Sequence, residues 1–384
     1  MSARKVIEVR PPVERALLVG SPRKGSKDAQ DVEEHLDELA RLVDTAGAAV
    51  AGRVVQIVAA PTPEFYIGKG KVEEVGRRMA ELGATLAIFD EELSPRQGKH
   101  LEDALKTRVM DRTELILDIF ALRARSLEAK MQVELAQLGY TLPRLTRMWV
   151  HLSRIRGGIG LRGPGETQLE TDRRMIRKKI GLLKEKLGHV AEHRARLSER
   201  TTGRGVLRVA LVGYTNAGKS SLLRALTRAD AHVEDRLFAT LDTASREAQV
   251  NGKTVRFTDT VGFIRKLPHD LVASFRATLE EALAADVVLH VVDVSHPAWG
   301  EQAQVVGEAL EAAGPRDDGT GGRIVVALNK ADRLEEADRE DRLSAAQAQG
   351  WEAVLVSAVK GSGLSDLAAA VTAASAPSSG RAIL

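Results

Sequence analysis

Apolar residues in the first part of the chain gather in short runs. The runs ALLVG (16–20), VVQIVAA (54–60), TLAIFD (85–90) and RVMD (108–111) are predicted to be strands, with helices at KVEEVGRRMAELG (71–83) and 95–106. Alternating strands and helices indicate a small α/β domain with a mostly parallel sheet over residues 1–112. The run IGKGK (67–71) lacks the Ser or Thr that a phosphate loop needs after its lysine, so a turn that opens a helix is predicted there.

After residue 112 the apolar period changes to steps of three and four. One seam comprises Leu115, Ile119, Leu122, Ser126, Ala129, Val133, Ala136 and Tyr140; a second comprises Ile176, Ile180, Leu183, Leu187, Val190, Arg194 and Leu197. The two seams predict an antiparallel coiled-coil hairpin over residues 113–202, with arms of about thirty residues, or about 45 Å. Pro143 is expected to end the first helix, and the capping box from Thr167 to Glu170 to start the second.

Strand and helix patterns return from Val206 to about residue 375, which predicts a further α/β domain over residues 203–376. The stretch ERTTGRG (199–205) is predicted to be a linker. The Ala/Ser-rich residues 377–384 are expected to be a flexible tail.

Composition narrows the class of protein. The chain has 384 residues, of which 43% are hydrophobic and 28% charged, as in globular proteins that work in water. It has no cysteine, which excludes disulfides, thiolate zinc sites and cysteine nucleophiles. No apolar run approaches the ~20 residues of a membrane span, and the first residues do not read as a secretory signal. A cytoplasmic protein without stable membrane insertion is therefore expected.

Positive charge is concentrated in one segment. Residues 144–180 hold ten Lys/Arg and three Asp/Glu, a balance of +7 against +3 for the whole chain, so the remainder carries −4. Such a patch is typical of proteins that bind a polyanion, although a solvated helix face has the same composition. Around the glycine-rich tip loop (157–170), the candidates for RNA contact are Arg154, Arg156 and Arg162. The 3% aromatic content favours contacts to the RNA backbone over base stacking.

The segment VLRVALVGYTNAGKSSLLRAL holds the clearest chemical motif. Gly213, Gly218, Lys219 and Ser220 have the spacing of a P-loop between a strand and a helix. Backbone amides and the helix N-terminus would bind phosphates, Lys219 would reach the β- and γ-phosphates, and the Ser220 hydroxyl would bind Mg²⁺. The nucleotide-binding candidates of this loop are Gly213, Tyr214, Thr215, Asn216, Ala217, Gly218, Lys219, Ser220 and Ser221.

A second motif selects the base. The strand IVVALNKAD ends in Asn329, Lys330 and Asp332, and an aspartate can accept hydrogen bonds from both N1–H and the 2-amino group of guanine. Asn329 would contact the base and brace the loop, and the Lys330 stem would lie over the ring. The backbone of Ser357 and Ala358 would contact guanine O6. Behind a P-loop, this order predicts GTP and GDP rather than ATP.

Two further segments supply switch residues. Asp259 ends a strand in VRFTDTVGF and suits water-mediated Mg²⁺ binding, while the Gly262 amide could donate to the γ-phosphate. Thr240 is the candidate switch threonine, with Thr243 as a competitor. The catalytic candidates are thus Lys219, Thr240 and Gly262, and the metal candidates are Ser220, Thr240 and Asp259.

The residue after Gly262 is Phe263, which cannot orient the attacking water as a glutamine does in many GTPases. Slow intrinsic hydrolysis that a partner accelerates is therefore expected. Asn216 resembles the asparagine of potassium-activated GTPases, or it braces its own loop. His290, in the apolar run DVVLHVVD, is expected to be a hydrogen-bonded core residue.

These motifs carry a resemblance. GYTNAGKS, DTVGF and NKAD resemble the translation-factor-related class of P-loop GTPases. DRTELILDIFALRARSLEAKMQVELAQLGYTLPRL (111–145) and GGIGLRGPGETQLETDRR (157–174) are similar to the HflX family of ribosome-associated GTPases, over residues from about 15 to 375. The resemblance implies an α/β multidomain fold: a small N-terminal α/β domain, a long antiparallel helical hairpin and a P-loop GTPase domain with a mostly parallel sheet.

The resemblance also implies binding to the large ribosomal subunit and its rRNA, with the tip loop towards the peptidyl transferase centre, and the splitting or rescue of stalled ribosomes under stress. The chain departs from the pattern by ending soon after the G domain and by having LDT where many relatives have Leu-Asp-Pro. Some relatives are described as binding ATP through the N-terminal domain, but no second phosphate loop is recognisable here.

Two other classes stay open at this point. A nucleotide-gated scaffold would bind a protein partner through the hairpin, and then loss of Arg154, Arg156 and Arg162 would hardly alter RNA association. An RNA-modification or membrane-remodelling GTPase would need a modification domain or a membrane segment, and neither is recognisable. No DNA partner is expected.

Overall fold

The computed structural model describes residues 13–145, 164–202, 205–228, 237–238, 240–242, 244–266, 284–312 and 323–374. The chain divides into two compact units. Unit 1 comprises Met1–Ile119 and Pro143–Leu169, and unit 2 comprises Phe120–Leu142 and Glu170–Leu384.

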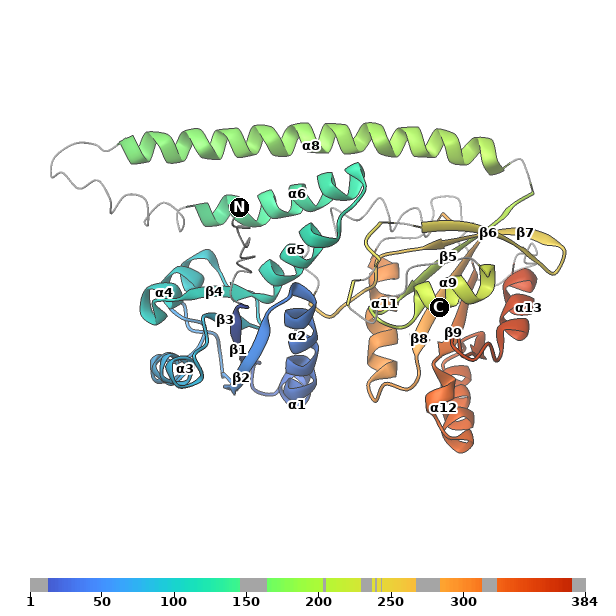
Figure 1. Ribbon diagram of the computed structural model, residues 1–384, viewed down its shortest axis with the longest axis horizontal. Helices are drawn as coiled ribbons and strands as arrows, with labels where there is room; N and C mark the ends of the chain where they lie inside the picture. Colours follow the sequence, from blue (N-terminus) through green and yellow to red (C-terminus); the bar gives the residue numbers. More distant parts are fainter. Residues whose placement is uncertain are drawn as a thin grey trace, which may run out of the picture. The chain divides into compact units, whose positions relative to one another are not determined.

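Unit 1 is built on a four-stranded parallel sheet in the order β2-β1-β3-β4 (Figure 1). Its strands are β1 (Arg15–Gly20), β2 (Ala49–Val55), β3 (Leu86–Phe89) and β4 (Arg108–Asp111). Its helices are α1 (Lys27–Gln30), α2 (Val32–Ala46), α3 (Lys69–Leu82) and α4 (Pro95–Leu105). Helices α3 and α4 cover one face of the sheet and α2 covers the other, so the two central strands, β1 and β3, are apolar and buried.

Two details of unit 1 differ from the sequence predictions. The strand predicted over VVQIVAA lies earlier, at Ala49–Val55, and helix α2 was not among the predicted helices. Strand β2 is an edge strand with mostly exposed or half-buried residues, so its apolar pattern is weak. The turn predicted at IGKGK is confirmed, because Gly68 is the N-cap of α3.

Buried charges occupy the carboxyl edge of this sheet. Arg112 donates to Asp90 at 2.7 Å and to Glu38. Arg144 lies 3.6 Å from Asp111, whose other hydrogen bonds come from backbone amides. Each buried guanidinium therefore meets a carboxylate that would otherwise be buried as a lone negative charge.

The first arm of the predicted hairpin is interrupted. Helix α5 spans Arg112–Arg123 and α6 spans Leu127–Thr141, so the prediction of one continuous helix is wrong. Ser126, expected in the seam, is instead the N-cap of α6, and its hydroxyl accepts from the amide of Ala129. Leu122, also expected in the seam, is 69% exposed. The helix breaks because the Ser126 side chain replaces an intrahelical partner.

Most of the other seam residues are confirmed, while the side chains of Arg194 and Leu197 lie outside the described part of the chain. Ala129, Val133 and Ala136 are buried on α6, and the seam residues of the second helix from Ile176 to Val190 are buried or half-buried. Helix α8 (Pro164–Thr202) runs alongside α6, and Lys179 forms an ion pair with Glu134 (Figure 1).

The ends of these helices correct two boundaries. Helix α6 ends at Thr141, before the 3₁₀ turn η1 (Leu142–Arg144) that contains Pro143, as predicted. Helix α8 begins at Pro164 rather than at Thr167, because proline has a fixed φ that suits the first helical turn. The predicted linker is also shorter, since α8 continues through Thr202.

Unit 2 contains a six-stranded sheet in the order β10-β9-β8-β5-β7-β6 (Figure 1). Its strands are β5 (Leu207–Gly213), β6 (Ala244–Val250), β7 (Lys253–Asp259), β8 (Val287–Asp293), β9 (Arg323–Asn329) and β10 (Ala353–Leu355). Only the pairing of β6 with β7 is antiparallel among the described strands, so the prediction of a mostly parallel sheet is confirmed.

Helices cover both faces of this sheet. Helices α9 (Lys219–Thr227) and α13 (Leu364–Ala374) pack on one face, and α11 (Trp299–Ala312) and α12 (Glu336–Ala348) pack on the other; the 3₁₀ turn η2 spans Ala331–Arg333. The carboxyl ends of the parallel strands β5, β7, β8 and β9 therefore meet at one edge, where ligands bind in such sheets. Within the described residues, no helix is both long and apolar enough to span a bilayer.

Candidate nucleotide-binding site

The turn between β5 and α9 has a backbone that requires glycine. Gly213 and Gly218 have φ of 155° and 92°. A Cβ on Gly213 would lie 2.2 Å from the Val291 carbonyl oxygen, and one on Gly218 would lie 2.3 Å from Nδ2 of Asn329. The glycines therefore allow the turn to pack against the ends of β8 and β9.

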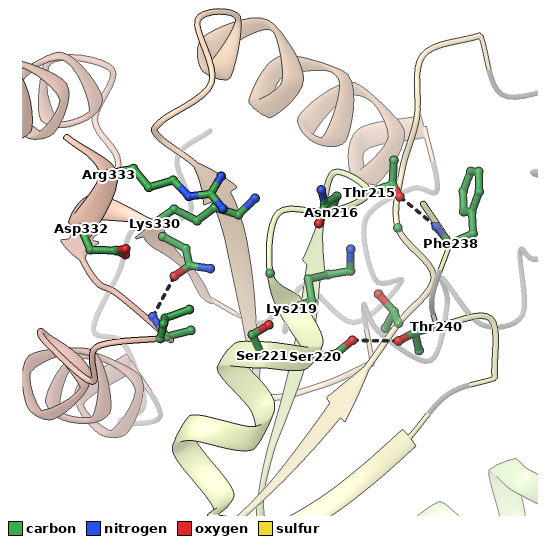
Figure 2. Close-up of a pocket in the computed structure, with 16 residues that line it drawn as sticks. Thr215, Asn216, Lys219, Ser220, Ser221, Phe238, Thr240, Lys330, Asp332 and Arg333 are labelled. Atoms are coloured by element: carbon green, nitrogen blue, oxygen red, sulfur yellow. Dashed lines mark hydrogen bonds between the residues drawn. The ribbon is translucent and has the colours of Figure 1, made fainter. Parts of the chain in front are cut away.

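A pocket of about 290 Å³ opens at this turn (Figure 2). It brings together the predicted site residues Thr215, Asn216, Gly218, Lys219, Ser220, Ser221, Thr240, Gly262, Asn329, Lys330, Asp332 and Ala358. The other predicted residues of the site, which support this wall, are Gly213, Tyr214, Ala217, Asp259 and Ser357. Residues more than a hundred positions apart in the sequence thus converge on one cavity.

Lys219 is buried at the start of α9. Its Nζ donates to the carbonyl oxygens of Gly213 at 3.1 Å and Tyr214 at 3.0 Å. Burial lowers the pKa of Lys219 to about 8, and the negative charge of Asp259 opposes the shift. The ammonium group is therefore held at the floor of the pocket by backbone oxygens.

Three oxygen-bearing side chains meet beside Lys219. Oδ2 of Asp259 lies 2.6 Å from Oγ of Ser220 and 2.9 Å from Oγ1 of Thr240. The two hydroxyls are 2.8 Å apart, and Figure 2 shows the hydrogen bond between them. Burial raises the pKa of Asp259, against the opposing charge of Lys219 and the hydrogen bonds from Ser220 and Thr240. Oδ1 of Asp259 is buried without a hydrogen-bond partner in the described part of the chain. A carboxylate with an unused oxygen between two hydroxyls fits the hard oxygen ligands that Mg²⁺ prefers.

The segment after Asp259 pairs with the P-loop. The Phe263 amide donates to Gly213, and the Phe263 carbonyl oxygen accepts from the Thr215 amide at 2.6 Å. A Cβ on Gly262 would lie 2.8 Å from Cα of Thr215, so a larger residue does not fit at this position. These backbone bonds set Gly262 at the wall of the pocket.

The opposite end of the pocket is braced by side-chain hydrogen bonds. Asn329 donates from Nδ2 to the Ala217 carbonyl oxygen at 2.9 Å and accepts at Oδ1 from the Ala358 amide at 3.1 Å. Ser357 donates to Oδ1 of Asp332 at 2.5 Å, and this hydrogen bond lowers the pKa of Asp332. Asp332 is thus held ionised, as an acceptor of hydrogen bonds from guanine would be. The role expected for Ser357 was through its backbone, whereas its hydroxyl makes this contact.

Sequence reasoning missed Arg333 and Val359, which line this end of the pocket, and Asp293, which supports it through Lys330. Oδ2 of Asp293 lies 2.6 Å from Nζ of Lys330, and Oδ1 accepts from the Ser295 amide and hydroxyl. Asp293 is the last residue of β8. Its place after an apolar strand, beside the strand of Asn329, was the available signal. The Asp293 carboxylate neutralises the Lys330 ammonium and fixes its stem at the pocket wall.

His290 is in the core, as expected, but is not fully hydrogen-bonded. Its Nε2 is buried and has no hydrogen-bond partner in the described part of the chain. Burial lowers the pKa of His290 to about 4, and the charge of Lys219 adds to the effect. The expectation of a satisfied histidine is therefore wrong for Nε2.

Four candidates lie outside the described residues: Thr243, Arg154, Arg156 and Arg162.

Three family models match consecutive parts of the chain. They are described as GTP-binding GTPase N-terminal (residues 33–121), GTP-binding GTPase Middle Region (123–201) and 50S ribosome-binding GTPase (208–330). Similar curated proteins carry the name GTPase HflX. The protein of Lacrimispora saccharolytica is 45% identical, over 91% of this chain and 84% of its own length. That of Caldanaerobacter subterraneus is 51% identical (84% and 73%), and that of Escherichia coli is 43% identical (94% and 82%).

Among crystal structures, one described as the SsGBP and GDP complex is similar to this chain. The two share 26% sequence identity with a TM-score of 0.52, over 94% of this chain and 98% of the other. That structure is a complex with GDP, and its likeness extends well beyond the nucleotide-binding domain alone.

Proposed function

This chain belongs to the HflX family of GTPases and hydrolyses GTP, and on that premise we propose that it binds the large ribosomal subunit in a nucleotide-dependent manner. The observation that carries the proposal is the long exposed helix α8. Its residues 169–193 hold seven Lys/Arg and four Asp/Glu. The exposed cations among them are Arg174, Arg177, Lys178, Lys179, Lys184 and Lys186. A surface of this kind suits contacts to RNA phosphates. The proposed RNA contacts also include Arg154, Arg156 and Arg162.

Sedimentation with purified large subunits tests the proposal. We expect association with a non-hydrolysable GTP analogue and much weaker association with GDP. Replacing Arg177 and Lys178 by Gln is expected to weaken binding and reduce its dependence on salt. Arg323→Gln removes an exposed cation at the start of β9 and serves as the control. Equal sedimentation in both nucleotides, or no association, contradicts the proposal. The scaffold alternative would be favoured if replacing Arg154, Arg156 and Arg162 left association with RNA unchanged and the hairpin bound a protein partner instead.

The site residues take the following proposed roles. Lys219 and the P-loop amides bind the β- and γ-phosphates, and the Gly262 amide donates to the γ-phosphate. Ser220, Thr240 and Asp259 hold Mg²⁺, which neutralises charge on the phosphate oxygens when bound. Asn329, Lys330, Asp332 and the Ser357–Ala358 turn bind guanine. The proposed domains are residues 1–112, 113–202 and 203–376, followed by the tail 377–384.

Hydrolysis is proposed to be slow in the isolated protein and faster on the ribosome. The support is Phe263, which has no group to orient water, and its backbone is already bonded to the P-loop. Turnover measured with and without large subunits tests this, and fast turnover by the isolated protein contradicts it.

Asn216 lines the pocket with φ of 61°, and we extend the proposal to K⁺ near this residue. Equal rates in potassium and sodium salts would refute that part.

We further propose that the protein acts in the cytoplasm and separates or rescues stalled ribosomes. The support is the family membership together with the basic helix α8. Light scattering of intact ribosomes mixed with the protein and a GTP analogue tests separation. An unchanged signal, with binding intact, would leave rescue or surveillance as the role.

A further inference from the structure

The switch segment (residues 237–242, of which 239 is outside the described part) contacts the helices α5 and α6 on both sides of Thr240. Before Thr240, the ring of Phe238 meets that of Phe120 edge to face, with centroids 4.6 Å apart, and both rings are buried. After Thr240, Asp242 contacts the start of α6. All of these residues belong to unit 2.

Asp242 caps the N-terminus of α6 from 116 residues away. Its carboxylate accepts from the Arg125 amide at 2.9 Å, from the Ser126 amide at 3.2 Å and from the Ser126 hydroxyl. The Ser126 Oγ in turn accepts from the Ala129 amide at 3.0 Å. A carboxylate at this end also interacts favourably with the helix dipole. A residue of the switch segment thus supplies hydrogen-bond acceptors to the N-terminus of α6.

Phe238 ties the same segment to the P-loop. Its φ of 53° is unusual for a bulky residue and requires support from its surroundings. The support comes from the Phe120 ring and from a hydrogen bond of 3.1 Å between the Phe238 amide and Oγ1 of Thr215 (Figure 2). Thr240 therefore lies between two contacts to the helices: Phe238 packs against α5, and Asp242 caps α6.

We propose that Asp242 is a positioning residue that couples Thr240 to the start of α6. The inference rests on the proposed role of Thr240 towards Mg²⁺ and the γ-phosphate. Binding of GTP would hold Thr240 in its place at the pocket and would thereby stabilise the Asp242 cap on α6. When a partner moves α6, the cap and Thr240 move with it. Because coupling between two binding events is reciprocal, binding at the helices changes the affinity for GTP by the same factor.

A helix cap without coupling would stabilise α6 equally in every nucleotide state, whereas a coupled cap stabilises α6 more in the GTP state. The first experiment tests which of the two holds. Affinities for a GTP analogue and for GDP are measured with the full chain. Asp242→Ala is expected to weaken analogue binding about tenfold, while GDP binding changes less than twofold, because GDP makes no contact through a γ-phosphate. Asp242→Asn keeps one acceptor oxygen and is expected to lie between. Ser126→Ala should act in the same direction, and the double variant should be no worse than Asp242→Ala.

Ser94→Ala provides the matched control. Ser94 is the N-cap of α4 in unit 1, in a capping box with Gln97. Losing this cap should leave the ratio of the two affinities unchanged. An equal loss of affinity for both nucleotides in Asp242→Ala, or no loss for either, overturns the coupling.

Hydrogen exchange at the amides of Arg125, Ser126 and Ala129 gives a second readout. We expect slower exchange with the GTP analogue than with GDP in the wild type, and no such difference in Asp242→Ala. Equal exchange in both nucleotides overturns the inference.

Thr240→Ala separates this failure from failure of the proposed site. If that variant binds the analogue and GDP like the wild type, the role of Thr240 is wrong. If Thr240→Ala lowers analogue binding but Asp242→Ala does not, only the coupling is wrong. Neither result depends on binding to ribosomes.

Discussion

Both units place acidic residues at the carboxyl edge of a parallel sheet, and the groups that meet those residues differ. In unit 1, buried Asp90 and Asp111 face the guanidinium groups of Arg112 and Arg144. In unit 2, Asp259 faces the hydroxyls of Ser220 and Thr240 and keeps one oxygen without a partner in the described part of the chain.

The chemical consequence follows from charge. An arginine neutralises its carboxylate permanently, so the negative charges at the edge of unit 1 are neutralised by side chains of the same unit. A hydroxyl does not neutralise the carboxylate charge, and it can rotate so that its oxygen binds the same cation as the carboxylate. The same strand-end position is thus a structural ion pair in one sheet and a candidate metal site in the other.

The largest effect is expected from breaking the ion pairs of unit 1. Arg112→Met leaves Asp90 buried without this partner and should destabilise unit 1 by about 3–5 kcal/mol, while the affinity for GDP changes little. Hydrogen exchange in β1 and β3, measured beside the Kd for GDP, checks both statements. Arg108→Met is the control, because Arg108 pairs with Glu114 and Asp118 at the surface and such pairs contribute about 0–1 kcal/mol. Similar hydrogen exchange in both variants would show that the buried ion pair stabilises unit 1 no more than the surface pair does.

The next effect concerns the glycine turn that keeps the edge of unit 2 open. Gly218→Ala places a methyl group against the amide of Asn329 at a φ of 92°, and we expect GDP affinity to fall about 100-fold, or about 2.7 kcal/mol. Calorimetric titration with GDP measures the change. Gly307→Ala in α11 meets no atom within 4 Å and should bind GDP normally. Normal binding by Gly218→Ala would mean that the turn adapts.

Buried histidines differ between the units in a way that pH can expose. His35 of unit 1 lies 3.9 Å from Asp90, whereas burial and the charge of Lys219 lower the pKa of His290 to about 4. Below its ordinary pKa of 6.5, the histidine takes up a proton in the unfolded chain but not in the folded one. Stability is therefore lost as pH falls from about 6.5 to 4, by about 2 kcal/mol at pH 5.

Denaturant unfolding at pH 5 and pH 7 checks this effect. His290→Leu should lose less stability than the wild type between the two pH values. His189→Leu, at an exposed site on α8, should behave like the wild type. Identical losses in His290→Leu and the wild type would refute the assignment.

The smallest effect is expected at the end of the pocket that is proposed to bind guanine, where unit 2 uses a half-buried ion pair between Lys330 and Asp293. Asp293→Ala leaves the Lys330 ammonium without its carboxylate and should raise the Kd for GDP about tenfold. The effect should be largely absent in a Lys330→Ala background. Asp286→Ala, which removes a carboxylate paired with Arg208 at the other end of β8, is the control and should change the Kd less than twofold. Equal effects of both substitutions would remove Asp293 from the site.

Several parts of the fold and the site were predictable because they depend on neighbours in the sequence. The spacing from Gly213 to Ser220 fixes a turn between a strand and a helix, and the structure places Lys219 and Ser220 at its pocket. The seam from Ile176 to Val190 follows from the helical period alone. Edge strand β2 was misplaced because its half-exposed residues lack an apolar pattern.

What the order of residues establishes is therefore local: the P-loop, the strands that end in Asp259 and Asn329, and the helical seams. Contacts between distant residues needed the folded chain. The amide of Ser126, at the break, donates to the carboxylate of Asp242, 116 residues away, and the Lys330 ammonium is held by Asp293, 37 residues before it. Neither pairing leaves a periodic signal, because a hydrogen bond between distant residues depends on where the strands and helices come together and not on the spacing within them.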